Sequence, residues 1–217
     1  METVFLTGGN GFTGRHILQL LRKKGFNVIA PSQIECNILD PSSISKYLSQ
    51  YKVDYVIHLA GISFVGEQDT SLFYKTNTIG SENLVKVLAG LNYPIKKIIV
   101  ASSATVYGNA GSGLVKENHP TNPVNHYGCS KLSMEYMLNF WSKKLPIIIV
   151  RPFNYTGPHH SNCFVVPKIV WHFAKKIPTI SLGNMDVIRE VNSIDFVTES
   201  YYRLLVSKEV VNGIFNI

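Results

Sequence analysis

Short apolar runs alternate along the chain with longer stretches in which apolar residues recur every three or four positions. The short runs are typical of buried strands, and the recurring positions are typical of helices with one apolar face. The expected strands lie at Val4–Leu6, Phe26–Ala30, Asp54–Ala60, Lys97–Ala101 and Ile147–Val150. The expected helices lie at 15–24, Ser43–Tyr51, Asp69–Leu91, Tyr127–Leu145, Val165–Lys176 and Phe196–Val206.

Strands and helices alternate as far as Val150, and the strands are continuously apolar. This pattern predicts an α/β fold in which a doubly wound parallel sheet carries helices on both faces. Prolines and glycines punctuate the chain after Arg151. We therefore expect one domain at residues 1–151 and a second, incomplete region at 152–217 that returns segments to the core. Gly213–Ile217 reads as the start of a strand that would be left unpaired or unfinished.

The composition indicates a globular protein, since 45% of the 217 residues are hydrophobic and 16% are charged. No apolar run approaches the ~20 residues that a membrane span needs. Glu2 and the early glycines do not suit a signal peptide. Cys36, Cys129 and Cys163 are sparse and widely spaced, so neither a disulfide framework nor a metal site is predicted. We expect a cytoplasmic protein without membrane contacts.

The net charge of +7 is spread over the chain in short basic pairs, such as Lys96-Lys97 and Lys143-Lys144. Several pairs fall late in expected helices, where cations complement the helix dipole and face water. This distribution favours solvated faces over a nucleic-acid surface. It is also compatible with a modest attraction for small anionic ligands.

Three glycines follow the first expected strand, at Gly8, Gly11 and Gly14, and a helix follows them. Glycine permits positive φ and close approach of a ligand to the backbone, and the helix start offers free N–H groups to an anion. The spacing differs from the standard G-x-G-x-x-G. A turn that binds nothing is the alternative. The flanking strand and helix favour a dinucleotide-binding Rossmann domain over residues 1–151.

The second expected strand ends at Ala30-Pro31-Ser32, where this fold usually places a carboxylate for the adenosine ribose. The missing carboxylate leaves room for a 2′-phosphate, and Arg15 is a possible partner for that group. NADP is therefore expected. NAD stays open, because Glu35 lies close by and no arginine adjoins the strand end.

Tyr127 and Lys131 are four residues apart, so a helix places them on one face. The lysine cation is expected to lower the pKa of the tyrosine toward the working pH, which suits proton transfer. Ser103 follows the fourth expected strand, at the edge where open α/β sheets bind ligands. Its hydroxyl could hold a carbonyl or alcohol oxygen beside Tyr127. His58, inside the third expected strand, is interpreted as a structural histidine.

The glycine turn with Ser103, Tyr127 and Lys131 resembles the extended short-chain dehydrogenase/reductases of the NAD-dependent epimerase/dehydratase group, which act on nucleotide sugars. The resemblance covers essentially the whole chain. It implies catalytic roles for Ser103, Tyr127 and Lys131. It also implies coenzyme contacts, which include an asparagine in place of the family's usual aspartate against the adenine. The implied coenzyme residues are Gly8, Asn10, Gly11, Phe12, Thr13, Gly14, Arg15, Ser32, Asn37, Ile38, Leu59, Ala60, Gly61, Asn77, Tyr127 and Lys131.

Within that family, the stretch 183–190 is most similar to the GDP-mannose dehydratases and the GDP-4-keto-6-deoxymannose reductases. Arg189 matches an arginine that grips the substrate diphosphate, and Asn154 matches a substrate-binding asparagine. Thr105 stands where the dehydratases carry a catalytic glutamate, so dehydration is not expected. The implied substrate contacts are Ser103, Ala104, Thr105, Asn154 and Arg189.

The resemblance thus implies an NADPH-dependent reductase acting on the C4 ketone of a GDP-4-keto-6-deoxyhexose. Two alternatives stay open: a nucleotide-sugar 4-epimerase with tightly bound NAD, and a non-catalytic nucleotide-binding protein. Family members often form homodimers through two long helices, here Asp69–Leu91 and Tyr127–Leu145. They also continue beyond the point that corresponds to Ile217, so the remainder of a substrate domain is expected to be missing.

Overall fold

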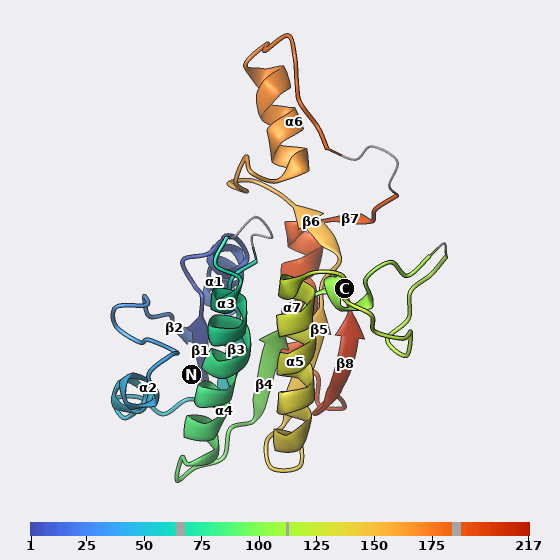
Figure 1. The fold of residues 1–217 in the computed structure, drawn as a ribbon. Coiled ribbons are helices and arrows are strands. Elements are labelled where there is room, and N and C mark those ends of the chain that lie inside the picture. Colours follow the sequence, from blue (N-terminus) through green and yellow to red (C-terminus); the bar gives the residue numbers. More distant parts are fainter. Residues whose placement is uncertain (64–67, 112, 184–187) are drawn as a thin grey trace.

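A computed structural model describes the chain except residues 64–67, 112 and 184–187 (Figure 1). Its centre is a six-stranded sheet in the order β2-β1-β3-β4-β5-β8, with every neighbouring pair parallel. This confirms the predicted doubly wound α/β sheet. The strands are β1 (Thr3–Thr7), β2 (Asn27–Ile29), β3 (Tyr55–His58), β4 (Lys97–Ala101), β5 (Ile147–Arg151) and β8 (Gly213–Asn216).

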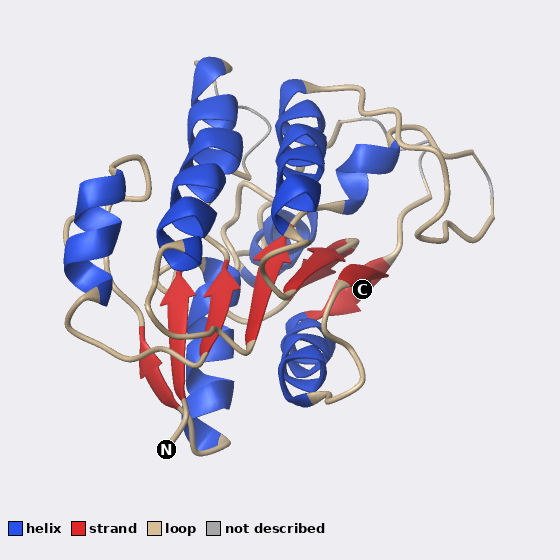
Figure 2. Ribbon diagram, turned by 90° about the horizontal axis from the view of Figure 1, so that it is seen from below, coloured by secondary structure: helices blue, strands red, loops and turns tan. Residues whose placement is uncertain are grey.

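Helices cover both faces of the sheet (Figure 2). One face carries α1 (Phe12–Lys23) and α7 (Ile194–Val206), which pack against each other. The other carries α2 (Pro41–Leu48), α4 (Ser81–Ala89) and α5 (His126–Trp141). Asp40 begins α2 by accepting a hydrogen bond from the Ser42 N–H at 2.9 Å, which satisfies one of the free donors of the first turn.

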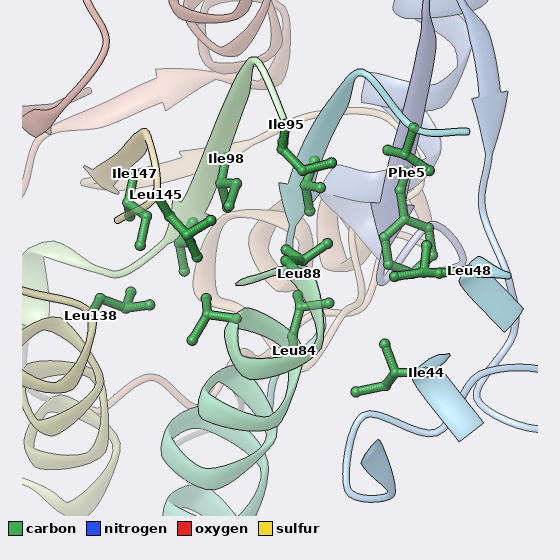
Figure 3. Close-up of a cluster of buried hydrophobic side chains, with 14 of the residues drawn as sticks. Phe5, Ile44, Leu48, Leu84, Leu88, Ile95, Ile98, Leu138, Leu145 and Ile147 are labelled. Carbon is green, nitrogen blue, oxygen red and sulfur yellow. The ribbon is translucent and has the colours of Figure 1, made fainter. Parts of the chain in front are cut away.

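The two hydrophobic clusters follow from strand geometry, because successive side chains of a strand point to opposite faces. Val4 and Leu6 pack with α1 and α7, whereas Phe5 between them packs with α2, α4 and α5. Figure 3 shows the second cluster, where Leu84 and Leu88 of α4 approach Ile98 of β4. Each such fully buried side chain contributes about 2 kcal/mol to folding.

The helix predicted at Asp69–Leu91 is observed, but its middle is wider than an α-helix. It consists of α3 (Ser71–Phe73), a π-helical segment (Tyr74–Gly80) and α4. Asn77 lies in the π segment and is fully buried. Its side-chain amide accepts from the Ile62 N–H at 2.9 Å and donates to the Ile62 carbonyl at 3.1 Å. Such π turns are common at functional sites.

The last strand corrects one expectation, since Gly213–Asn216 is paired. It joins β5 in parallel, with Ile148 opposite Gly213 and Arg151 opposite Asn216. The reason is topological: α7 packs on α1 and returns the chain to the open edge of the sheet. The division into two domains at residue 151 stays a prediction.

Three elements extend beyond the carboxyl edge of the sheet and form what we call the arm (Figure 1). The arm comprises β6 (Asn154–Thr156), α6 (Val165–Ala174) and β7 (Val191–Ser193), with β6 and β7 paired in parallel. The predicted helix at Val165–Lys176 is confirmed, but none of the α6 residues is buried. In the described part of the chain, no helix has both the length and the hydrophobicity that crossing a bilayer requires.

Candidate active site

The glycine turn forms a tight cradle between β1 and α1. Gly8 has a φ of 72°, and a Cβ there would lie 2.7 Å from the Ala60 nitrogen. A Cβ on Gly14 would lie 2.1 Å from the Gly8 oxygen, so the turn closes on the helix only with glycine at that position. No side chain caps the start of α1 at Gly11. The first-turn N–H groups therefore fit a diphosphate.

The side chains of Phe12 and Thr13 reach away from this cradle toward the chain that follows β5. The Thr13 Oγ1 lies 2.7 Å from the Tyr155 hydroxyl. Phe12 stacks on His160 with ring centroids 4.1 Å apart, and His160 stacks on Phe164 at 4.3 Å. The backbone of Phe12 and Thr13, rather than their side chains, is thus available to a coenzyme. No role was predicted from the sequence for Tyr155 or His160.

The residues expected at the adenosine end lie around the loop between β2 and α2. Asn37 accepts from the Leu39 N–H at 3.0 Å through Oδ1. Ile38 is buried against Gly80, where an added Cβ would lie 2.8 Å from the Ile38 Cδ1. Ser32 is half-buried just after β2, and Asn10 is exposed. Ser32, Asn37 and Ile38 thus lie in the β2–α2 connection, and their role at the adenosine end stays a prediction.

Arg15 lies elsewhere. It lines a cavity of about 250 Å³ together with side chains of α1 and of the segment after β6. Its partners there are Phe12, His16, Gln19, Pro158 and His159. Among the described residues, its guanidinium has no hydrogen-bond or ion-pair partner. The structure therefore does not place Arg15 beside Ser32 for a shared phosphate.

Tyr127 and Lys131 lie on the inner face of α5 and are 9% and 6% exposed. Asn125 starts this helix by accepting from the Gly128 N–H at 2.8 Å. Burial raises the pKa of Tyr127 to about 12, although the Ser103 hydroxyl beside the phenol lowers it. The expected lowering of this pKa by Lys131 is wrong for the protein without ligand, because burial dominates. Tyr127 is therefore protonated at neutral pH.

Lys131 points at the end of β4, where its Nζ donates to the Ala101 carbonyl at 2.7 Å. Burial lowers the pKa of Lys131 to about 8. Gly61 leaves room for this side chain, since a Cβ there would lie 3.4 Å from the Lys131 Nζ and 2.7 Å from the Asn77 Oδ1. The Lys131 Nζ thus lies where four parts of the fold meet: the ends of β3 and β4, the π segment and α5.

Ser103 and Thr105 share a short 3₁₀ turn at Ala104–Tyr107. The Ser103 Oγ accepts from the Thr105 N–H at 3.2 Å and from the Thr105 hydroxyl at 2.9 Å. The Ala104 N–H donates to the Pro152 carbonyl at 2.9 Å, which ties this turn to the end of β5. The Ser103 hydroxyl proton is left to point toward Tyr127 or a ligand.

His58 is confirmed as a structural histidine, because both ring nitrogens have partners inside the protein. Its Nδ1 lies 2.6 Å from the Thr7 Oγ1, and its Nε2 lies 2.9 Å from the Ser81 Oγ. Burial, with a smaller contribution from the Lys131 charge, lowers the pKa of His58 to about 3. The imidazole is therefore neutral at pH 7.

A buried ion pair between α5 and β5 supports the site, and it was not predicted from the sequence. Arg151, at the end of β5, donates through Nε to Glu135 at 2.9 Å and through Nη2 at 2.5 Å, and both side chains are 5% exposed. Ser102 also donates to Glu135, and the Arg151 Nη1 donates to the Tyr107 hydroxyl at 2.8 Å. Glu135 lies four residues after Lys131 on α5, but no spacing along the chain marks Arg151 as its partner.

Two of the five expected substrate residues, Asn154 of β6 and Arg189 just before β7, lie near each other. The Asn154 Nδ2 donates to the Glu190 carbonyl at 3.2 Å, which brings Asn154 beside the residue that follows Arg189. Both Asn154 and Arg189 are exposed. No contact in the described part of the chain joins either one to Ser103, Tyr127 or Lys131. The stretch 183–190 that suggested GDP-sugars lies partly outside the described residues, at 184–187.

Comparisons with known proteins agree with this geometry. The model of the NAD dependent epimerase/dehydratase family matches residues 4–217. The GDP-6-deoxy-D-talose 4-dehydrogenase of Aggregatibacter actinomycetemcomitans is 38% identical over 99% of this chain and 73% of its own length. The GDP-6-deoxy-D-mannose reductase of Pseudomonas aeruginosa is 27% identical over 100% of this chain and 74% of its own. The structure of RMD from Pseudomonas aeruginosa complexed with NADPH is 26% identical, with a TM-score of 0.88 over 100% of this chain and 77% of its own.

Proposed function

The chain belongs to the NAD dependent epimerase/dehydratase family, and from this premise we propose that it reduces the C4 ketone of a GDP-4-keto-6-deoxyhexose with a nicotinamide coenzyme. One observation carries the proposal. A buried tyrosine that holds its proton lies beside a serine hydroxyl and a lysine, at the sheet edge next to a diphosphate cradle. Reduction of a ketone needs a proton donor at the carbonyl oxygen, and this arrangement supplies one.

When bound, a reduced nicotinamide supplies the hydride to C4. Tyr127 gives its phenolic proton to the alkoxide oxygen that forms, since its raised pKa keeps it protonated until that oxygen becomes strongly basic. Ser103 donates a hydrogen bond to the same oxygen, and one such donor is worth about 10²–10³ in rate. Lys131 stabilises the phenolate that remains and binds the nicotinamide ribose.

Thr105 supports reduction over dehydration. Its hydroxyl donates to the Ser103 Oγ at 2.9 Å, so it orients the serine. A threonine hydroxyl has no acid–base chemistry near neutral pH, so the site lacks a second proton carrier at this position. In this proposal Asn154 and Arg189 bind the sugar nucleotide, with the guanidinium on its diphosphate.

The two relatives support a C4 reaction on a GDP-linked sugar. One is named for oxidation at C4 of a GDP-6-deoxy-talose, and the other for formation of a GDP-6-deoxy-mannose. Talose and mannose differ in configuration at C4 alone, so the two names correspond to hydride delivery to opposite faces of one carbonyl. The higher identity to the talose enzyme supports the talo product.

A homodimer is part of the proposal. The helices α4 and α5 lie side by side on one face of the sheet (Figure 1), and α5 exposes large apolar side chains. Tyr136 is 64% exposed and Phe140 is 80% exposed. Pairing of these two helices with those of a second copy would cover both residues. Light scattering of the purified protein tests this, and a monomeric mass at micromolar concentration would contradict it.

The decisive experiment is a coenzyme-oxidation assay with GDP-4-keto-6-deoxymannose and with UDP- and dTDP-linked 4-keto-6-deoxy sugars. We expect one coenzyme oxidised per sugar reduced, preference for the GDP-linked substrate, and a talo product by NMR. Interconversion of two C4 epimers without net coenzyme oxidation would replace the proposal with the 4-epimerase. If coenzyme binds but none of these sugars reacts, the non-catalytic alternative gains support instead.

A further inference from the structure

The end of β2 carries a carboxylate after all, although the sequence has none at Ala30-Pro31-Ser32. The chain turns after Ser32, and the Cys36 N–H donates to the Ser32 carbonyl at 3.0 Å. This turn brings Glu35 back onto Ser32, three residues beyond the end of β2. Its Oε2 accepts from the Ser32 backbone N–H at 2.7 Å and from the Ser32 hydroxyl at 2.8 Å.

This carboxylate lies next to the glycine turn. The strands β1 and β2 are neighbours, with Phe5 opposite Ile29. A Cβ on Gly9 would lie 2.8 Å from the Ala30 Cβ, so the glycine turn touches the last residues before Ser32. In a dinucleotide fold, the adenosine ribose occupies the space between these two segments.

Glu35 is free to bind a further hydroxyl. Both of its hydrogen bonds use Oε2, and within the described residues Oε1 has no partner. The side chain is exposed. The hydrogen bonds from Ser32 hold the pKa of Glu35 below its ordinary value, so the group is ionised at neutral pH. One anchored oxygen and one open oxygen suit a ribose diol.

The surroundings do not suit a 2′-phosphate. No lysine or arginine occurs between Lys24 and Lys46, which covers β2 and the turn after it. Arg15, the candidate partner, lines a cavity with Pro158 and His159 instead. A phosphate placed on the ribose beside Glu35 would therefore meet a negative charge without a cation to offset it.

We propose that Glu35 determines the coenzyme preference, by binding the adenosine ribose diol and repelling a 2′-phosphate, so that the protein uses NAD(H) in preference to NADP(H). The inference rests on the proposed function, because it assumes a nicotinamide coenzyme in the glycine cradle. It reverses the expectation of NADP, which followed from the missing carboxylate at Ser32. The acid comes from the turn, three residues later, and not from the strand end itself.

The test measures coenzyme binding without sugar, by titrating the purified protein with NADH and with NADPH and following nicotinamide fluorescence. We expect NADH to bind about tenfold more tightly than NADPH, a difference of the size that one nearby charge produces. Glu35→Gln keeps an acceptor for Ser32 but removes the charge, and it should bring the two dissociation constants within about twofold. Glu35→Arg should favour NADPH. Glu209→Gln, which removes an exposed charge elsewhere, is the matched control and should change neither constant.

Equal or tighter binding of NADPH by the unaltered protein would overturn the inference, and so would an unchanged ratio in Glu35→Gln. In both cases coenzyme still binds and the sugar assay still reports reduction, so the proposed function would survive. Failure of either coenzyme to bind at all would overturn both.

Discussion

At the carboxyl edge of the sheet, the functional side chains are buried and held by the protein itself, whereas in the arm they are exposed. Tyr127 and Lys131 are at least nine-tenths buried, and Lys131 is already hydrogen-bonded to β4. Asn154 and Arg189 are exposed; Asn154 lies in β6, which pairs with β7 alone, and Arg189 lies two residues before β7. The proton-transfer machinery is therefore preorganised, and the groups assigned to substrate recognition are open to solvent. Substitutions should accordingly separate chemistry and stability from binding.

The largest effect is expected from Tyr127→Phe, which removes the proton donor and leaves the ring. The rate of ketone reduction should fall by about 10²–10⁴. Stability should be unchanged, because the ring still packs near Phe73, with centroids 6.0 Å apart. Steady-state kinetics and thermal unfolding of the same preparation check both parts. A loss of less than threefold would remove Tyr127 from the chemistry.

Next in size is the effect of Glu135→Ala on folding. This change leaves the Arg151 guanidinium buried without its partner, which should cost about 3–5 kcal/mol of unfolding free energy. Glu199→Ala is the matched control, since Glu199 pairs with Arg203 on the surface, and the loss there should stay below about 1 kcal/mol. Denaturant unfolding measures both. Equal losses in the two variants would show that the buried pair does not support the sheet edge.

The buried lysine predicts a pH dependence of stability. The pKa of Lys131 is about 8 in the folded protein and 10.5 as an ordinary lysine. Between these values the unfolded state binds the proton and the folded state does not, so stability rises with pH. The gain is about 3 kcal/mol over the whole window. Lys131→Met should lack this rise when unfolding is compared from pH 7.5 to 10. An equal rise of the unfolding free energy with pH in both proteins would show that other groups cause the pH dependence.

The smallest effect belongs to the arm. Arg189→Ala should raise KM for the GDP-sugar by about 10–100-fold, with little change in kcat, because it removes a charged hydrogen-bond donor to the diphosphate. Its exposure predicts unchanged stability. Arg203→Ala, an exposed arginine of α7, is the control. A fall in kcat at unchanged KM would place Arg189 in the chemistry and blur the distinction between the two regions.

The pattern of the sequence predicted the parts of this molecule that depend on neighbouring residues. The five strands up to β5, the glycine turn and the Tyr127–Lys131 spacing are all local, and periodicity or spacing reveals them. The ion pair between Glu135 and Arg151 is not local. It forms because α5 packs over β5, and no spacing along the chain encodes that distance.

The same reason explains why the sequence left the role of Glu35 open and why the expected pKa of Tyr127 is wrong. The sequence shows that Glu35 lies close to the end of β2, but only the turn and its hydrogen bonds with Ser32 place the carboxylate there. The raised pKa of Tyr127 results from burial by surrounding elements. Considering Tyr127 and Lys131 as a pair accounts for the attraction between the phenolate and the lysine cation. It leaves out the removal of water around the phenol, which raises the pKa.

The π segment at Tyr74–Gly80 sets the direction in which the residues before it face. A π turn carries one more residue than the α-helical turn it replaces, so the wider turn absorbs that residue without changing the phase of the flanking helices. If the same residues formed a regular α-helix, everything N-terminal to them would rotate by about 100° relative to α4. Phe73 would then turn away from the Tyr127 ring, while Leu84 and Leu88 stayed in the core. The width of this turn therefore decides whether Phe73 packs beside the active-site tyrosine.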